Sequence, residues 1–575
     1  MLKYFFKIPN PHNHFIDVSI QLGVENLSAV SFQLPSWRPG RYELGDFAKK
    51  IKDFNAFNEN SNELSFNKLT KDKWQIDTSE SMFVTVNYKY YANELNAGST
   101  FLDDSQLYVN PINCCMYTDF GIDQRCEISL ELPENYSVVS SLQQLNGTNR
   151  FAAENFHELV DSPFICGNSI KRYSYTSNKT TFHLCFQGEV KPDENKLITD
   201  FKKFTDFQIE LFGAFPSDEY YFLFQITPYN SYHGVEHQKS TVILLGPSYD
   251  IFNKKYDSLL GIASHELYHT WNVKTIRPVD MLPYDYTAEN YTHMGYVTEG
   301  VTTYMGDRIL FESGVFTLKN YFRELENLLT RHFHNDGRKH YSVAESSFDT
   351  WLDGYISGIP GRKVSIYVEG ALVALICDAR IRECTNDTSS LHTVLKQMYS
   401  GNKKLSGYDR NSYQALLEKV AGQSFNDIFD HLIYGKNDFS PYLEKAFQFW
   451  GWKYKKIPSN KALERYGIKA SWSNGSYSIA SVLEESSAYK SGLVNDDKIH
   501  SVNGFKLNGD INQWLDYFSG DEIVISFQRG GLLKRTLLFP INRLFIFPFQ
   551  LNKLHPNEQT FQHDLLYRQI HLHQL

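Results

Sequence analysis

The chain has 575 residues, more than one hydrophobic core usually supports, so about two to four domains are expected. Hydrophobic residues make up 42% of it and aromatic residues 15%, a composition that allows large packed cores and argues against disorder. The formal charge is −9 and no long basic run is present, which argues against a nucleic-acid partner and against an anionic membrane surface.

The cysteines and the apolar runs indicate the cellular compartment. Seven cysteines are present, an odd number, and none of them form a Cys-x-x-Cys pair, which is typical of reduced thiols in packed cores. The longest purely apolar run, ALVALIC, is too short to cross a bilayer. Prolines, asparagines and histidines interrupt the N-terminal segment MLKYFFKIPNPHNHF, so we expect no signal peptide there and a cytoplasmic location, unless a leader has been removed.

Residues 1–170 read as a domain of β-strands. The segments FIDVSIQL, AVSFQLP, MFVTVNYKYYA and CEISLEL alternate apolar and polar residues or are rich in β-branched and aromatic residues. Clusters of Asn, Gly and Pro separate them, and no long helical period is visible. The expected structure is therefore an antiparallel β-sandwich-like domain.

Residues 171–452 form the second expected domain, which opens with strands and becomes mostly helical. The strands are YYFLFQITP and STVILLG. Apolar residues then recur at helical spacing in YDSLLGIASHELYHTWN, MGYVTEGVTTYMGDRILFESG and SIYVEGALVALICDARIREC.

Residues 453–545 form a third, smaller β-domain, and residues 546–575 read as a tail. The segment EIVISFQRGGLLKRTLLF predicts a hairpin that turns at Gly530 and Gly531. Three tail histidines lack any fixed ligand spacing and are interpreted as surface residues: His563, His571 and His573.

The stretch SLLGIASHELYHTWN carries two histidines four positions apart on a predicted helix. Positions i and i+4 lie one turn apart on one face, so His265 and His269 could hold one zinc ion together. Glu266 lies one position round from His265, where a carboxylate can take a proton from zinc-bound water without ligating the metal. The alternative is an ordinary helix with two satisfied histidines.

A third ligand would separate these two interpretations, and two glutamates are candidates. Glu289 lies in the polar segment YTAENYT, which reads as a loop, whereas Glu299 lies in GYVTEGVTTYMGD among apolar residues at helical spacing. A ligand on a second helix is held more rigidly, so Glu299 is favoured.

The segments HELYHTWNVKTIRP and GYVTEGVTTY together resemble the glycyl aminopeptidase family of zinc metallopeptidases, which are gluzincins with a thermolysin-like catalytic domain. The family continues its histidine helix into Trp-Asn-Val-Lys and Ile-Arg-Pro and then a Glu-Gly ligand motif. LPSWRPGRYELGDFAKKIKDFNA resembles the family's N-terminal Trp-x-Pro-Gly-x-Tyr segment, and SSAYKSGLVNDDKIHSVNG resembles an appended PDZ domain. The resemblance implies a multidomain α+β chain, one zinc ion, and Glu299 as the third ligand.

The same resemblance implies residues that contact the substrate. In YHGVEHQKSTVILLG it places Gly234 against the substrate backbone and Glu236 on the free α-amine. In SIYVEGALVALICD it makes the Tyr367 hydroxyl the donor to the oxyanion. The chain departs from the family pattern at two positions: His233 stands where glycine is usual, and Glu369 where lysine is.

We therefore expect a zinc aminopeptidase that removes N-terminal Gly or Ala from peptide substrates. A zinc endopeptidase is the close alternative, since it would differ only in how Glu236 and the cleft are used. The rival from another class is a catalytically silent scaffold whose PDZ unit binds a peptide or protein ligand. Such a unit adds a strand and captures a carboxylate at a glycine loop, for which RYGIKAS is the candidate.

Overall fold

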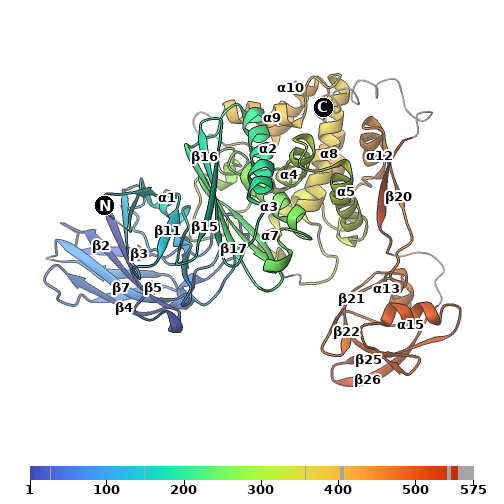
Figure 1. Cartoon of the computed structure of the whole chain (residues 1–575), viewed down its shortest axis with the longest axis horizontal. Helices are drawn as coiled ribbons and strands as arrows, with labels where there is room; N and C mark the ends of the chain where they lie inside the picture. The colour runs from blue at the N-terminus through green and yellow to red at the C-terminus, as the bar shows by residue number, and fades with distance from the viewer. Residues whose placement is uncertain are drawn as a thin grey trace.

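The computed structural model shows three successive regions in the chain: a β-rich N-terminal region, a mixed central region and a small C-terminal region (Figure 1). The described residues are 1–554 apart from 26, 80, 148, 357, 402–406 and 540–545. Within them, every helix is too short or too polar to span a lipid bilayer. The expected tail histidines His563, His571 and His573 lie outside the described residues.

The N-terminal region consists of three β-sheets around one core. Its elements are β1 (Leu2–Lys7), β2 (Phe15–Gly23), β3 (Ala29–Gln33), β4 (Ile51–Asn58), β5 (Phe66–Thr70), β6 (Lys73–Asp77), β7 (Phe83–Tyr91), β8 (Phe101–Leu102), β9 (Gln106–Val109), β10 (Cys126–Glu131), β11 (Ser137–Ser140), β12 (Gln143–Gln144), β13 (Arg150–Ala153), α1 (Phe156–Val160) and β14 (Phe164–Gly167). The sheet orders are β12-β13-β10-β1-β2-β7-β4, β11-β14-β9-β8 and β3-β6-β5.

Alternating burial explains why these segments form strands. In β2 and β7 every second side chain is buried, the pattern of a strand with one face on a core. Buried side chains of all three sheets belong to one hydrophobic cluster, so the sheets share a core. The expected antiparallel β domain is present, with one parallel pair, β1 with β10.

The central region combines a five-stranded mixed sheet with helices. Its strands are β15 (Lys171–Ser177), β16 (Thr180–Gln187), β17 (Glu219–Ile226), β18 (Ser231–Glu236) and β19 (Ser240–Gly246), in the order β15-β16-β17-β19-β18. Its helices include α2 (Glu194–Phe212), α3 (Tyr256–Tyr268), the π-helical turn η6 (Tyr296–Val301), α4 (Thr302–Glu312), α5 (Leu318–Phe333), α6 (Val343–Phe348), α7 (Thr350–Asp353), α8 (Ile366–Cys384), α9 (Leu391–Gly401), α10 (Arg410–Ala421) and α12 (Ser440–Phe449).

The apolar pattern of α8 explains its central place among these helices. Apolar residues occur on all its faces, and nearly its whole length is buried. β18 lies at the edge of the sheet, antiparallel to β19. One hydrophobic cluster joins the sheet to the helices, and this core holds α3, η6 and α8 close together.

The C-terminal region has a separate small core and a six-stranded sheet. Its elements are α13 (Ala462–Arg465), β21 (Ile468–Ser473), β22 (Ser476–Val482), α14 (Ser487–Lys490), β23 (Lys498–Val502), β24 (Phe505–Lys506), α15 (Ile511–Tyr517), β25 (Ile523–Arg529) and β26 (Leu532–Leu538). The predicted hairpin is confirmed: β25 and β26 pair, and Gly530 and Gly531 between them have φ of +55° and +83°. Positive φ at both turn residues is what a two-residue hairpin requires.

The boundaries of the C-terminal region differ from those expected. β20 (Trp452–Lys456) pairs with β27 (Phe549–Lys553), and the side chains of Trp452, Phe549 and Leu551 belong to the central core. The expected tail therefore begins with a strand of the central region, because burying these large apolar side chains holds it there. The chain leaves the central region after β20 and returns to it at β27.

Candidate active site

The two histidines converge at the end of α3. His265 lies in its last turn and His269 caps it, and their Nε2 atoms are 3.1 Å apart. The Nδ1 of His269 is 2.9 Å from the carbonyl oxygen of Asn272, and a carbonyl can only accept. That contact places a proton on Nδ1 of His269, so Nε2 is the nitrogen that faces His265 and could bind a metal.

Glu299 completes this cluster from η6. Its Oε2 lies 3.4 Å from Nε2 of His269 and 3.8 Å from Nε2 of His265. The ligand atoms of the three residues all lie within 4.8 Å of one another. The structure thus brings Glu299 to the histidines, and Glu289 does not line this site. The π-helical form of the turn carries no sequence signal that we recognised, although such turns are frequent at functional sites.

Two close contacts fix η6 against its neighbours. The side-chain amide of Asn272 donates to the carbonyl of Val297 at 2.8 Å and to the hydroxyl of Thr302 at 3.0 Å, which ties η6 to the end of α3. On its other side, a Cβ on Gly300 would lie only 2.4 Å from Cα of Gly370 in α8. The glycine after the glutamate is needed because two backbones approach closely there.

Glu266 is buried beside the cluster, with 6% of its surface exposed. Its Oε2 has no hydrogen-bond partner among the described residues, and a Cβ on Gly234 would lie 2.1 Å from its Oε1. Burial raises the pKa of Glu266 to about 8, with the carboxylates of Glu236 and Glu299 adding to the effect and His269 opposing it. The side chain therefore lies directly under the backbone of the edge strand.

The pKa values of the two histidines are shifted in opposite directions. Burial and the nearby ring of His269 lower the pKa of His265 well below its ordinary value. Burial also disfavours charge on His269, but its contact with the Glu299 carboxylate raises the pKa of His269 to about 10. In the metal-free protein the proton at this cluster is therefore held by His269.

Glu236 ends the edge strand β18 and is buried within 4.8 Å of ligand atoms of Glu266 and His269. The N-terminal region covers it from the other side: Gly40 has φ +78°, and a Cβ there would lie 2.4 Å from Oε2 of Glu236. Glu236 thus occupies the end of the cleft, on the edge strand where it was expected.

The two departures from the family pattern each have a partner in the structure. His233 accepts a hydrogen bond from the Ala97 N–H at 3.2 Å, and burial together with the charge of Arg38 lowers the pKa of His233 to about 3. The neutral ring therefore links the edge strand to the N-terminal region. Glu369 is buried and accepts a hydrogen bond from Nδ1 of His332 at 2.7 Å, so the buried carboxyl group has a side-chain partner.

Tyr367 lies at the start of α8 and faces the same space. The described part of the chain offers its hydroxyl no hydrogen bond, and burial together with the charge of Glu299 keeps the pKa of Tyr367 well above its ordinary value. The hydroxyl therefore stays protonated and is free to donate to another group.

One cavity of about 640 Å³ brings the expected residues together. All seven line it: Gly234, Glu236, His265, Glu266, His269, Glu299 and Tyr367. Asp307 also lines it, and burial with the nearby Glu324 raises the pKa of Asp307 to about 8. The cavity thus combines two imidazoles, three close carboxylates and a free phenol, a set suited to metal binding and hydrolysis.

Sequence reasoning missed Tyr42 and Gly40. The Tyr42 hydroxyl donates to Oε1 of Glu299 at 3.0 Å, across 257 positions of the chain. Both residues belong to the segment WRPGRY, which resembled the family's N-terminal motif but whose place in the fold could not be read from its composition.

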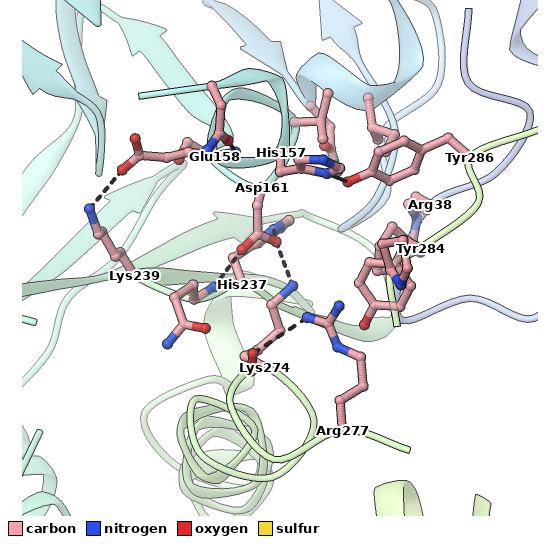
Figure 2. Close-up of a pocket in the computed structure, with 18 of the residues that line it drawn as sticks. Arg38, His157, Glu158, Asp161, His237, Lys239, Lys274, Arg277, Tyr284 and Tyr286 are labelled. Carbon is pink, nitrogen blue, oxygen red and sulfur yellow. Dashed lines mark hydrogen bonds and ion pairs between the residues drawn. The ribbon is translucent and has the colours of Figure 1, made fainter. Parts of the chain in front are cut away.

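A second cavity, of about 560 Å³, lies beyond Glu236 between the N-terminal and central regions (Figure 2). At its centre the Asp161 carboxylate accepts from Lys274 at 2.7 Å and from His237 at 3.1 Å. Burial opposes charge on this carboxylate, but Lys274 and His237 hold the pKa of Asp161 well below its usual range. Because His237 directly follows Glu236, this ion network anchors the end of β18.

Two family models match the chain. The Peptidase M61 N-terminal domain matches residues 3–168, and the M61 glycyl aminopeptidase matches residues 258–373. No curated protein matches the chain.

Solved structures also resemble the chain. An aminopeptidase N family protein from Idiomarina loihiensis has 27% identity and a TM-score of 0.91, with 98% of this chain and 100% of that chain covered. A mutant M1 zinc metallopeptidase from Deinococcus radiodurans, bound to a Tyr-Ser-Ala substrate, has 12% identity and a TM-score of 0.48 over 77% of this chain and 95% of its own.

The two family matches include the segment that holds Gly40 and Tyr42 and the segment that holds the histidines, Glu299 and Tyr367. The likeness to the aminopeptidase N family protein extends over nearly the whole chain. The chain therefore resembles the M61 peptidases in both of these domains, over residues 3–168 and 258–373, and it is a peptidase.

Proposed function

We propose that this peptidase is a zinc-dependent aminopeptidase whose single zinc ion is held by His265, His269 and Glu299. The observation that carries the proposal is the convergence of two imidazole nitrogens and one carboxylate within 4.8 Å, inside a cleft. Two histidines and a glutamate are a donor set of catalytic zinc sites. The buried Oε2 of Glu266, which lacks a partner among the described residues, fits a base beside that metal.

A second cluster, of Glu236, Glu266 and His269, also has its ligand atoms within 4.8 Å of one another. We favour the first set because it has two imidazoles, which suit zinc better than two carboxylates with one imidazole. It also leaves Glu266 and Glu236 free for proton transfer and for substrate binding.

Zinc, when bound, would supply Lewis-acid polarisation of the scissile carbonyl and a more acidic water. Glu266 takes the proton of the attacking water and delivers it to the leaving amine. The free Tyr367 hydroxyl donates a hydrogen bond to the oxyanion that develops on the carbonyl. The backbone of Gly234, directly above Glu266, aligns the peptide along the edge strand.

Glu236 supports exopeptidase over endopeptidase activity. Gly40 closes one side of its carboxylate, and the ion pair of Asp161 and His237 lines the second cavity beyond it. A substrate with further residues on the N-terminal side of this position would meet these groups. A substrate that begins there has a free α-amine, which would pair with the Glu236 carboxylate. The match to the M61 glycyl aminopeptidase model supports Gly as the preferred first residue, and we extend the preference to Ala because it is similarly small.

The discriminating experiment compares matched peptides that start with Gly or Ala and carry a free or an acetylated amine. Acetylation should cost about 10- to 150-fold in kcat/KM, because a charge-assisted hydrogen bond is lost. Equal rates on both peptides would instead indicate the endopeptidase. No cleavage of either by the zinc-loaded protein would favour the silent scaffold.

The C-terminal region is proposed to be a PDZ-like unit with a peptide ligand. β21 is an edge strand, and Gly467 just before it has φ +84°, which fits a strand-addition site behind a glycine loop. A cytoplasmic location is proposed from the cysteines, since all seven are free thiols and six of them are buried.

A further inference from the structure

The two carboxylate oxygens of Glu299 face different partners. Oε2 faces the histidine nitrogens, at 3.4 and 3.8 Å, while Oε1 accepts the hydroxyl of Tyr42 at 3.0 Å. Both side chains are almost fully buried, Glu299 with 4% and Tyr42 with 6% of its surface exposed. Water therefore has little access to this contact, and the Tyr42 hydroxyl is the group that holds the second oxygen.

The hydroxyl of Tyr42 is a permanent donor in this position. A phenol is protonated at neutral pH and the carboxylate oxygen that faces it can only accept, so the hydroxyl donates. A buried carboxylate that accepts such a bond cannot rotate freely about its last side-chain torsion. The bond therefore selects the orientation in which Oε2 points to the histidines.

Residues of the central region hold Tyr42 in turn. Its backbone N–H donates to the Tyr355 hydroxyl at 3.1 Å, and its ring packs edge-on against Trp351 with centroids 5.9 Å apart. The neighbouring Arg41 guanidinium lies 4.1 Å above the Tyr355 ring. Tyr42 is thus clamped across the boundary between the N-terminal and central regions before it reaches Glu299.

We propose that Tyr42 is a positioning residue for Glu299, so that the N-terminal region completes the metal site and sets its affinity. The proposal rests on the proposed role of Glu299 as a zinc ligand. Partners that orient a ligand from behind change metal affinity by about 10- to 100-fold when they are removed. Tyr367, whose hydroxyl is free, keeps the separate role at the oxyanion.

The test measures zinc affinity in full-length, metal-free protein by competition with a chromophoric chelator. Tyr42→Phe should weaken zinc binding about 10- to 100-fold. Tyr4→Phe is the matched control, because the Tyr4 hydroxyl is also buried in the N-terminal region and donates to the Met116 carbonyl at 2.8 Å, away from the cleft. The control should change stability but leave the zinc Kd unaltered.

The outcomes separate this proposal from the proposed function. Zinc bound tightly by the wild type, lost in His265→Ala and unaffected in Tyr42→Phe would overturn the positioning role alone. Absence of zinc binding by the wild type would overturn both. Tyr355→Phe is a second variant that tests the proposal even if Tyr42→Phe does not fold. Tyr355 is 42% exposed, so removing its hydroxyl should leave the fold intact while it removes the hydrogen bond from the Tyr42 backbone N–H. It should weaken zinc binding severalfold, and a wild-type Kd would count against the proposal.

Discussion

At the scale of single residues, Glu266 is a carboxyl group held away from water. It is buried, one oxygen lacks a partner among the described residues, and the backbone of Gly234 lies against the other. Glu266→Gln should retain zinc and lose about 10²- to 10⁴-fold in kcat, because an amide cannot take the proton. Glu289→Gln, at the rejected ligand candidate, should keep normal turnover. Metal analysis alongside kcat checks both, and near-normal turnover in zinc-loaded Glu266→Gln would exclude it as the base.

The raised pKa of Glu266 predicts that the stability of the metal-free protein depends on pH. Its pKa is raised from 4.5 to about 8, so the folded state binds a proton more tightly than the unfolded state. Its contribution to stability is therefore full below pH 4.5 and is lost as the pH rises toward 8. The loss is at most about 1.4 kcal/mol per pH unit. Between pH 6.5 and 8 the free energy of unfolding should fall more for the metal-free wild type than for Glu266→Gln. Equal decreases in urea titrations would contradict this.

The convergence of the proposed zinc ligands was predictable from local patterns. His265 and His269 share a face through the helical repeat, and the apolar neighbours of Glu299 separated it from Glu289. Glu236, Gly234 and Tyr367 came from the family resemblance, and the structure places all of them at one cavity. Tyr42 was not predictable, since no local rule links residues 257 positions apart.

At the scale of elements, the site depends on how closely η6 approaches α8. A Cβ on Gly300 would lie 2.4 Å from the α8 backbone, where no flexible side chain can move aside. Gly300→Ala should therefore destabilise the protein by about 1–3 kcal/mol and weaken zinc binding by shifting Glu299.

The control for this prediction is Gly261→Ala in α3. A Cβ there meets only Oδ1 of Asp307, at 3.9 Å, so the substitution should be neutral or stabilising by up to about 1 kcal/mol through helix propensity. The test measures the free energy of unfolding and the zinc Kd of both variants. Similar stabilities for the two would show that the contact between η6 and α8 is not tight.

Elements with a strong periodic pattern were predicted well, and those set by distant contacts were not. α3, the opening strands of the central sheet and the β25–β26 hairpin follow from apolar spacing and turn glycines. The π-helical form of η6 and the pairing of β20 with β27 do not, because packing against α8 and the central core selects them.

At the scale of the whole molecule, the cleft is closed by a segment of another domain. Gly40→Ala would place a methyl group 2.4 Å from Oε2 of Glu236 and displace that carboxylate. We expect kcat/KM on free-amine peptides to fall about 10- to 150-fold, with the zinc Kd unchanged. Gly213→Ala is the matched control. Gly213 has φ +89° and nothing lies within 4 Å of a Cβ there, so this substitution carries the same backbone strain of about 1–2 kcal/mol without a contact to a carboxylate. Equal losses of kcat/KM in both variants would assign the effect to strain.

The return of the chain at β27 makes the C-terminal region an insert rather than an appendage (Figure 1). Lys456, where the chain departs, pairs directly with Phe549, where it comes back. A truncation after β20 would strip Phe549 and Leu551 from the central core, so lost activity in such a protein would report damaged packing. Splicing β20 to β27 through a short turn would remove the insert alone. Because β20 and β27 pair where the insert begins and ends, any peptide it captured would be tethered to the molecule that carries the cleft, at a raised effective concentration.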